Sequence, residues 1–226
     1  MAVKKNTGKV LTKRRRSINK ACKTRKNKAC KKIKGGSGAN NNNVFGYSFF
    51  PQTEAALLME YERGISNINV SKEFCENNSQ YKLNLSNKWN IRELYNEINR
   101  IYEDTISYND AFEINENITF KQFILKLHMF VVNAYHMLHY ILECSENRNA
   151  KINLSAIYNG LQKFIIFLRK VDLNDNSIPE NLSAIKMNAD TIFTRNNGNI
   201  ILFGNIVGYI SDMVTITENK NYSNSV

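Results

Sequence analysis

Residues 119–145, TFKQFILKLHMFVVNAYHMLHYILECS, decide the fold, because they form the longest run of helical hydrophobic spacing in the chain. Thr119 and Gln122 have the spacing of a capping box, which predicts the first turn of a helix. One side of the stretch then carries apolar residues at intervals of three and four, as a helix face packed into a core does: Phe123, Leu127, Phe130, Val131, Ala134, Leu138 and Ile141. We therefore predict a long helix that ends near Ser145.

Similar patterns on both sides of this stretch predict a mainly α fold with a helical bundle-like body. One helix is expected over Thr53–Arg63, where Gly64 stops it. A capping box at Asn90 and Glu93 opens another. Further helices are expected over Leu154–Val171 and from Ser177, with Pro179 in the first turn.

Residues 191–217 allow two predictions. Asn197-Gly198 lies between TIFTR and NIILF, which favours a C-terminal β-hairpin. The alternative is a last helix, because hydrophobic residues follow a period of 3.6 in this segment: Phe203, Ile206, Val207, Ile210, Met213 and Val214. We prefer the helix and keep the hairpin as the alternative.

The charge of the chain is divided between its two parts. Residues 1–34 hold 15 of the 31 Lys and Arg residues and no acid, so the remainder has 31 − 15 = 16 basic and 20 acidic residues, a net charge of −4. We predict a disordered basic arm over 1–34, a flexible linker over 35–43 (GGSGANNNN) and a globular domain over 44–226. So dense a positive charge is typical of non-specific binding to nucleic acid. The residues expected to contact phosphate are Lys4, Lys5, Lys9, Lys13, Arg14, Arg15, Arg16, Lys20, Lys23, Arg25, Lys26, Lys28, Lys31, Lys32 and Lys34.

The body shows no pattern that we associate with catalysis. Phosphate-binding glycine loops, serine-hydrolase elbows and CxxC metal pairs do not occur in the sequence. Four cysteines without a CxxC pair also argue against a secreted disulfide scaffold, and Cys144 is expected to be a packed cysteine. We therefore predict a non-enzymatic protein without a cofactor, a secretory signal or a membrane span.

The three histidines share one face of the long helix, opposite its hydrophobic side. His136, His139 and Glu143 are weak candidates for a metal site, because their spacing matches no standard motif. The preferred interpretation is a polar face that packs against a neighbouring helix or subunit. Protonation near pH 6 would then loosen that interface.

Ile33-Lys34-Gly35-Gly36-Ser37 lies where the arm meets the linker. It resembles the (Met/Ile/Leu)-x-Gly-Gly-x pattern that adenovirus-type maturation proteases and their relatives in large DNA viruses cut. Together with the basic arm, it makes the chain similar to small basic virion or core proteins of those viruses. The resemblance covers only these residues and the character of the arm.

The resemblance implies a structural protein of the virion that assembles with itself or with other virion proteins and is cleaved between Gly36 and Ser37. One alternative is a nuclear or chromatin-associated adaptor whose arm, through Lys13–Arg16, acts as an import signal. Another alternative is an enzyme of an unrecognised family.

Cleavage predicts a new N-terminus. Mass spectrometry of the protein from its natural source should find a chain that begins at Ser37. A chain that begins at Met1 or Ala2 would contradict the prediction.

Overall fold

The computed structural model describes residues 53–106, 114–174, 178–194 and 199–223. The chain divides into two units, Met1–Val44 and Phe45–Val226, and all described residues belong to the second. They form seven α-helices and no strand, so the mainly α prediction is confirmed for this part of the chain. None of these helices is long and apolar enough to cross a membrane.

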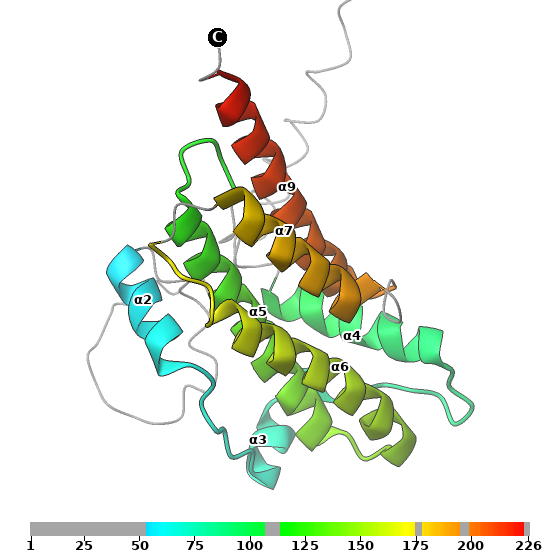
Figure 1. Cartoon of the computed structure of the whole chain (residues 1–226). Helices are drawn as coiled ribbons and strands as arrows, with labels where there is room; N and C mark the ends of the chain where they lie inside the picture. The colour runs from blue at the N-terminus through cyan, green and yellow to red at the C-terminus, as the bar shows by residue number, and fades with distance from the viewer. Residues whose placement is uncertain (1–52, 107–113, 175–177, 195–198, 224–226) are drawn as a thin grey trace, which may run out of the picture. The chain divides into compact units, whose positions relative to one another are not determined.

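The order of the elements is shown in Figure 1. In chain order they are α2 (Glu54–Arg63), α3 (Lys72–Asn77), the short 3-10 helix η1 (Ser79–Tyr81), α4 (Ile91–Ile106), α5 (Phe120–Cys144), α6 (Arg148–Leu168), α7 (Ile178–Ala189), the π-helical turn η2 (Asp190–Thr194) and α9 (Ile201–Ser223).

Helix α5 lies at the centre of this unit (Figure 1). It contacts α2, α3, η1, α6 and α9, and 17 of its 25 residues are buried. The hydrophobic stripe predicted from the sequence is buried throughout. The opposite face is not solvated, however, since His128 and Asn133 on that face are buried as well. The helix is thus enclosed on nearly all sides, as a core helix is.

The predicted start of α5 is confirmed. The backbone N–H of Gln122 donates to Thr119 Oγ1 at 3.1 Å, and that of Thr119 donates to Gln122 Oε1 at 3.2 Å. The capping box predicted at the start of α4 is only half present. Asn90 Oδ1 accepts from the backbone of Arg92 and Glu93, but the Glu93 carboxylate accepts instead from the backbone and hydroxyl of Ser86.

Helix α6 begins earlier than the sequence pattern predicts. The prediction placed its start at Leu154, whereas Asn147 caps it by accepting from the backbone N–H of Ala150 at 3.0 Å. The additional turns are polar, apart from Ala150 and Ile152, and so lack a hydrophobic stripe. An N-cap asparagine was the signal that could have located this start.

The hairpin alternative for residues 191–217 is wrong where the structure describes them, because Ile201–Ser223 form helix α9. Burial follows the 3.6-residue period, through Phe203, Ile206, Ile210 and Met213. Phe203 stacks on Phe193 of η2 with ring centres 4.6 Å apart, and Phe193 meets Phe164 of α6 edge-on at 5.1 Å. The preferred prediction of a last helix is therefore confirmed, and Asn197-Gly198 lie outside the described residues.

The end of α2 is fixed against the end of α6. The Tyr61 hydroxyl donates to the backbone carbonyl of Leu168 at 2.9 Å, and Arg169 donates to that of Glu62 at 3.2 Å. Gly64 ends α2 with φ of 70°, and a Cβ there would collide with the Arg169 guanidinium. The positive φ therefore favours glycine at this position, and a larger residue would also require the Arg169 side chain to shift.

Removing the α5 cap should weaken the fold measurably. We expect Thr119→Ala to lower the free energy of unfolding by about 1 kcal/mol, since the N–H of Gln122 loses its partner. Urea denaturation of the full chain measures this. Thr215→Ala, the same change at an exposed position inside α9, is the control and should lower it by less than about 0.5 kcal/mol. Equal losses would mean that the cap contributes nothing specific.

Candidate functional site

The 15 cations of the arm and the predicted cleavage residues Gly36 and Ser37 lie outside the described residues. The site that can be described is the C-terminal half of α5 with the segment that crosses it. This region contains the weak metal candidates His136, His139 and Glu143, as well as Cys144.

The three candidate ligands are not brought together as a metal site. No group of three or more His, Cys, Asp and Glu side chains among the described residues could hold a metal ion. His139 Nε2 is instead hydrogen-bonded to the backbone carbonyl of Ile68 at 2.9 Å. The Glu143 side chain is exposed, one turn further along the helix.

His139 belongs to a polar contact between α5 and α6. A hydrogen bond joins the hydroxyls of Tyr135 and Tyr158, whose rings stack at 4.2 Å. The Tyr158 hydroxyl also lies 3.4 Å from His139 Nδ1. Because a carbonyl only accepts, His139 Nε2 carries the proton toward Ile68, and Nδ1 faces the tyrosine hydroxyl. Burial, followed by the hydrogen bond with Tyr135, raises the pKa of Tyr158 and keeps it protonated.

His128 occupies a more isolated position between α5 and α2. It is 1% exposed, its ring meets that of Tyr61 edge-on at 4.8 Å, and neither ring nitrogen has a hydrogen-bond partner among the described residues. Burial, with a smaller contribution from the charge of Arg169, lowers its pKa to about 4. The polar face of α5 therefore packs against neighbouring helices of the same chain.

His136 behaves similarly, since burial and the neighbouring His139 lower its pKa to about 4. The expectation that protonation near pH 6 loosens an interface is therefore wrong for these two histidines. In the folded protein both stay neutral at pH 6, because their surroundings exclude the water that would solvate the charge.

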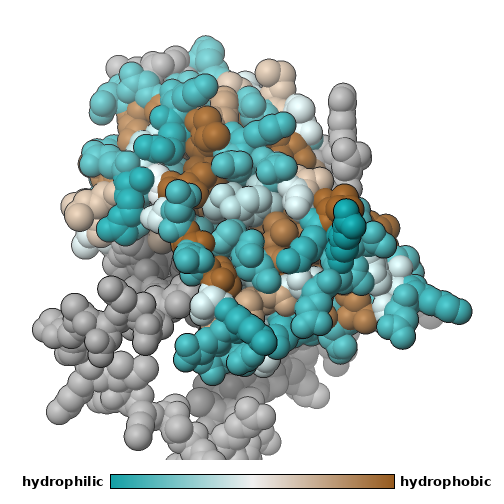
Figure 2. Space-filling model, turned by 90° about the horizontal axis from the view of Figure 1, so that it is seen from below, coloured by the Kyte–Doolittle hydropathy of each residue, from teal (hydrophilic) through white to brown (hydrophobic). Residues whose placement is uncertain are grey.

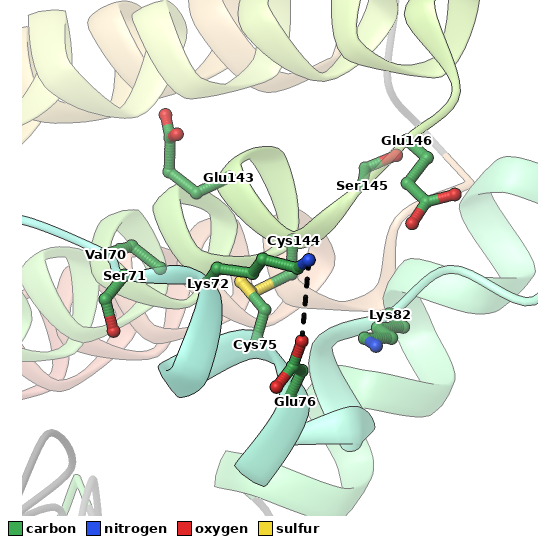
Figure 3. Close-up of a pocket in the computed structure, with 10 residues that line it drawn as sticks. All are labelled: Val70, Ser71, Lys72, Cys75, Glu76, Lys82, Glu143, Cys144, Ser145 and Glu146. Atoms are coloured by element: carbon green, nitrogen blue, oxygen red, sulfur yellow. Dashed lines mark ion pairs between the residues drawn. A yellow bond between two sulfur atoms is a disulfide. The ribbon is translucent and has the colours of Figure 1, made fainter.

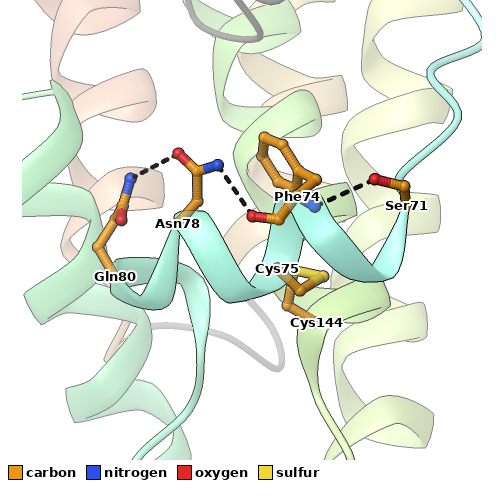
Figure 4. The surroundings of a disulfide bond; sticks show 6 residues. All are labelled: Ser71, Phe74, Cys75, Asn78, Gln80 and Cys144. Carbon is orange, nitrogen blue, oxygen red and sulfur yellow. Dashed lines mark hydrogen bonds between the residues drawn. A yellow bond between two sulfur atoms is a disulfide. The ribbon is translucent and has the colours of Figure 1, made fainter.

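A disulfide joins Cys75 of α3 to Cys144, the last residue of α5, with the two Cα atoms 5.3 Å apart (Figure 4). Nothing in the sequence predicted this pairing, because 69 positions separate the cysteines and no spacing rule connects them. Two observations could have raised the question: Cys75 and Cys144 are the only cysteines outside the arm, and Cys144 ends a buried helix. A cross-link over 69 positions stabilises the fold by about 4 kcal/mol through chain entropy.

The disulfide lines a hollow of about 340 Å³ (Figure 3). Five charged side chains surround it: Lys72, Glu76, Lys82, Glu143 and Glu146. Figure 3 shows the Lys72 side chain passing beside the two sulfurs toward Glu76, with which it forms an ion pair at 3.9 Å. The side chains that line the hollow carry both positive and negative charge, and the disulfide forms part of its wall. Thiol–disulfide exchange is therefore the chemistry that this hollow can support.

No family model matches the chain, and the curated proteins and solved structures contain no significant match to it.

The lowered pKa values of His128, which is buried, and His136, which is half-buried, predict a dependence of stability on pH. In the unfolded chain each has a pKa near 6.5, and in the folded chain the value is about 4. The unfolded state therefore binds more protons between these values. Stability that is fully present above pH 6.5 should be lost as the pH falls toward 4, by up to about 1.4 kcal/mol per pH unit for each histidine.

His128→Met isolates one of the two contributions. Methionine is apolar and adaptable, so the free energy of unfolding at pH 7.5 should stay the same or rise. Between pH 6 and 5 its pH dependence should be about half that of the unsubstituted chain, as measured by urea denaturation at each pH. An unchanged slope would contradict the assignment of His128 as a buried neutral group.

Proposed function

We propose that this chain is a non-enzymatic structural protein that binds nucleic acid through its basic arm and carries that arm on a helical body. The observation that carries the proposal is the division of charge, with 15 cations and no acid in residues 1–34 and a net charge of −4 in the remainder. A phosphate backbone is the partner that neutralises such an arm most effectively, through release of condensed counterions.

The described surface of the body is consistent with this division of charge between a basic arm and a mildly acidic body. Basic side chains on the helices are partly engaged with acids, as in the ion pairs of Arg63 with Glu60, Arg100 with Glu97 and Lys121 with Glu54. On the face seen in Figure 2, hydrophilic residues predominate and hydrophobic ones lie in small groups between them. Neither feature resembles a basic groove, so the body would contribute little to the binding of nucleic acid.

A virion or core particle of a large DNA virus is the setting that we propose, on the basis of the Gly-Gly sequence at Gly35-Gly36. There the body would provide contacts to other copies or to other structural proteins. The nucleus is the alternative setting, in which Lys13–Arg16 would serve import. The virion setting requires that the arm bind nucleic acid, whereas import through the arm does not, and the salt dependence of binding tests that activity.

Full-length protein should bind duplex DNA with little sequence preference and with an affinity that falls steeply as salt rises. Replacing Arg14, Arg15 and Arg16 with Gln should reduce the slope of log affinity against log salt by roughly 2–3, about 0.9 for each phosphate that the variant no longer neutralises. Electrophoretic mobility shifts at several salt concentrations measure the slope.

The matched control removes the same charge from the body, by replacing the exposed Lys163, Lys170 and Lys186 with Gln. This variant should retain the original slope. If the body variant loses as much affinity as the arm variant, general net charge rather than the arm governs binding, and the proposal is wrong.

A further inference from the structure

Residues 65–90, which we call the strap, connect α2 to α4 and cross the C-terminal end of α5. They include α3 and η1. Tyr81 is the only buried residue in the strap, and α3 has none. A segment that buries so little apolar surface gains little free energy from packing and is among the first to open.

A few non-covalent contacts attach the strap to the helices. The Phe74 and Tyr81 rings lie 4.9 and 5.5 Å from that of Tyr140 on α5, and His139 bonds the carbonyl of Ile68. Near α4 the hydrogen bonds from Asn84 and Ser86 to glutamates are exposed to solvent. Exposed hydrogen bonds of this kind contribute little, because water replaces them readily. The Cys75–Cys144 bond is the covalent attachment.

The two cysteines are not equally exposed. Cys144 is 6% exposed and Cys75 is partly exposed, and both line the charged hollow described above. We therefore expect a thiolate from solvent to reach the Cys75 sulfur first. Figure 4 shows Cys75 on the side of α3 that faces α5, with Ser71 capping this short helix at its start.

We propose that Cys75–Cys144 is a thiol–disulfide exchange site whose reduction by a dithiol releases the strap from α5 while the helical core stays folded. This proposal is independent of nucleic-acid binding by the arm. Because the strap covers Tyr140 and bonds His139, its release would uncover both side chains at the end of α5.

The exchange has two steps. A thiolate of the dithiol attacks the Cys75 sulfur, a mixed disulfide forms, and Cys144 leaves as a thiolate that takes a proton from water. The second thiol of the reagent then loses its proton and attacks the reagent sulfur that is bound to Cys75, and Cys75 leaves as a thiolate that takes a proton from water. Two electrons and two protons pass to the protein, and the reagent becomes a disulfide.

Limited trypsin digestion of the full chain tests the release. Cys22→Ser and Cys30→Ser in the arm leave the two body cysteines as the only thiols, and mass spectrometry after alkylation reports their redox state. Dithiothreitol should accelerate cleavage at Lys72, Lys82 and Lys88 of the strap about tenfold or more. Cleavage at Lys163 of α6 and Lys186 of α7, both exposed, should not change.

Two outcomes would overturn the proposal. Unchanged cleavage of the strap would show that other contacts hold it, and equal acceleration in α6 and α7 would show that the disulfide clamps the whole body. A Cys75→Ser, Cys144→Ser variant should match the reduced protein without reductant and keep its helical circular dichroism. Glutathione, a monothiol probe, should be trapped on Cys75, and an adduct on Cys144 would contradict the order of attack.

Discussion

The burial of α5 is the constraint on which the rest of the structure depends. A helix of 25 residues with 17 of them buried cannot exist without neighbours on several sides. Helices α2, α6 and α9 provide that cover directly, and α4 and α7 are held through their contacts with α9. The same burial explains the unusual chemistry of the helix. Burial lowers the pKa of His128 and of His136, and Cys144 at the end of the helix is bonded to Cys75.

The main helices could be predicted because their signals are local. Capping residues such as Thr119 and hydrophobic residues at helical intervals fix the starts and faces of helices without any knowledge of their neighbours. What failed depended on distant parts of the chain. The pairing of Cys75 with Cys144 and the burial of His128 under Tyr61 are both set by tertiary contacts. Helix α3 was missed for a related reason, since it buries nothing and shows no hydrophobic period.

The candidate site was predictable only as a set of residue types. The sequence placed His136, His139 and Glu143 on one side of the long helix, which left metal binding open. The geometry does not support a metal site. The two ring nitrogens of His139 contact the Ile68 carbonyl and the Tyr158 hydroxyl, and the Glu143 side chain is exposed to solvent. For the arm, by contrast, the sequence alone indicates the kind of partner. Its charge points to a polyanionic partner whatever the fold, since counterion release depends on the number of cations and little on their arrangement.

The enclosed position of α5 has a direct test in native-state hydrogen exchange of the full chain. If all other helices depend on this one, the amides of residues 124–141 should exchange most slowly, and only through global unfolding. Their opening free energy should then equal the free energy of unfolding measured with urea. Amides of α5 that exchange through a smaller opening, while those of α6 or α9 remain protected, would contradict the central role of this helix.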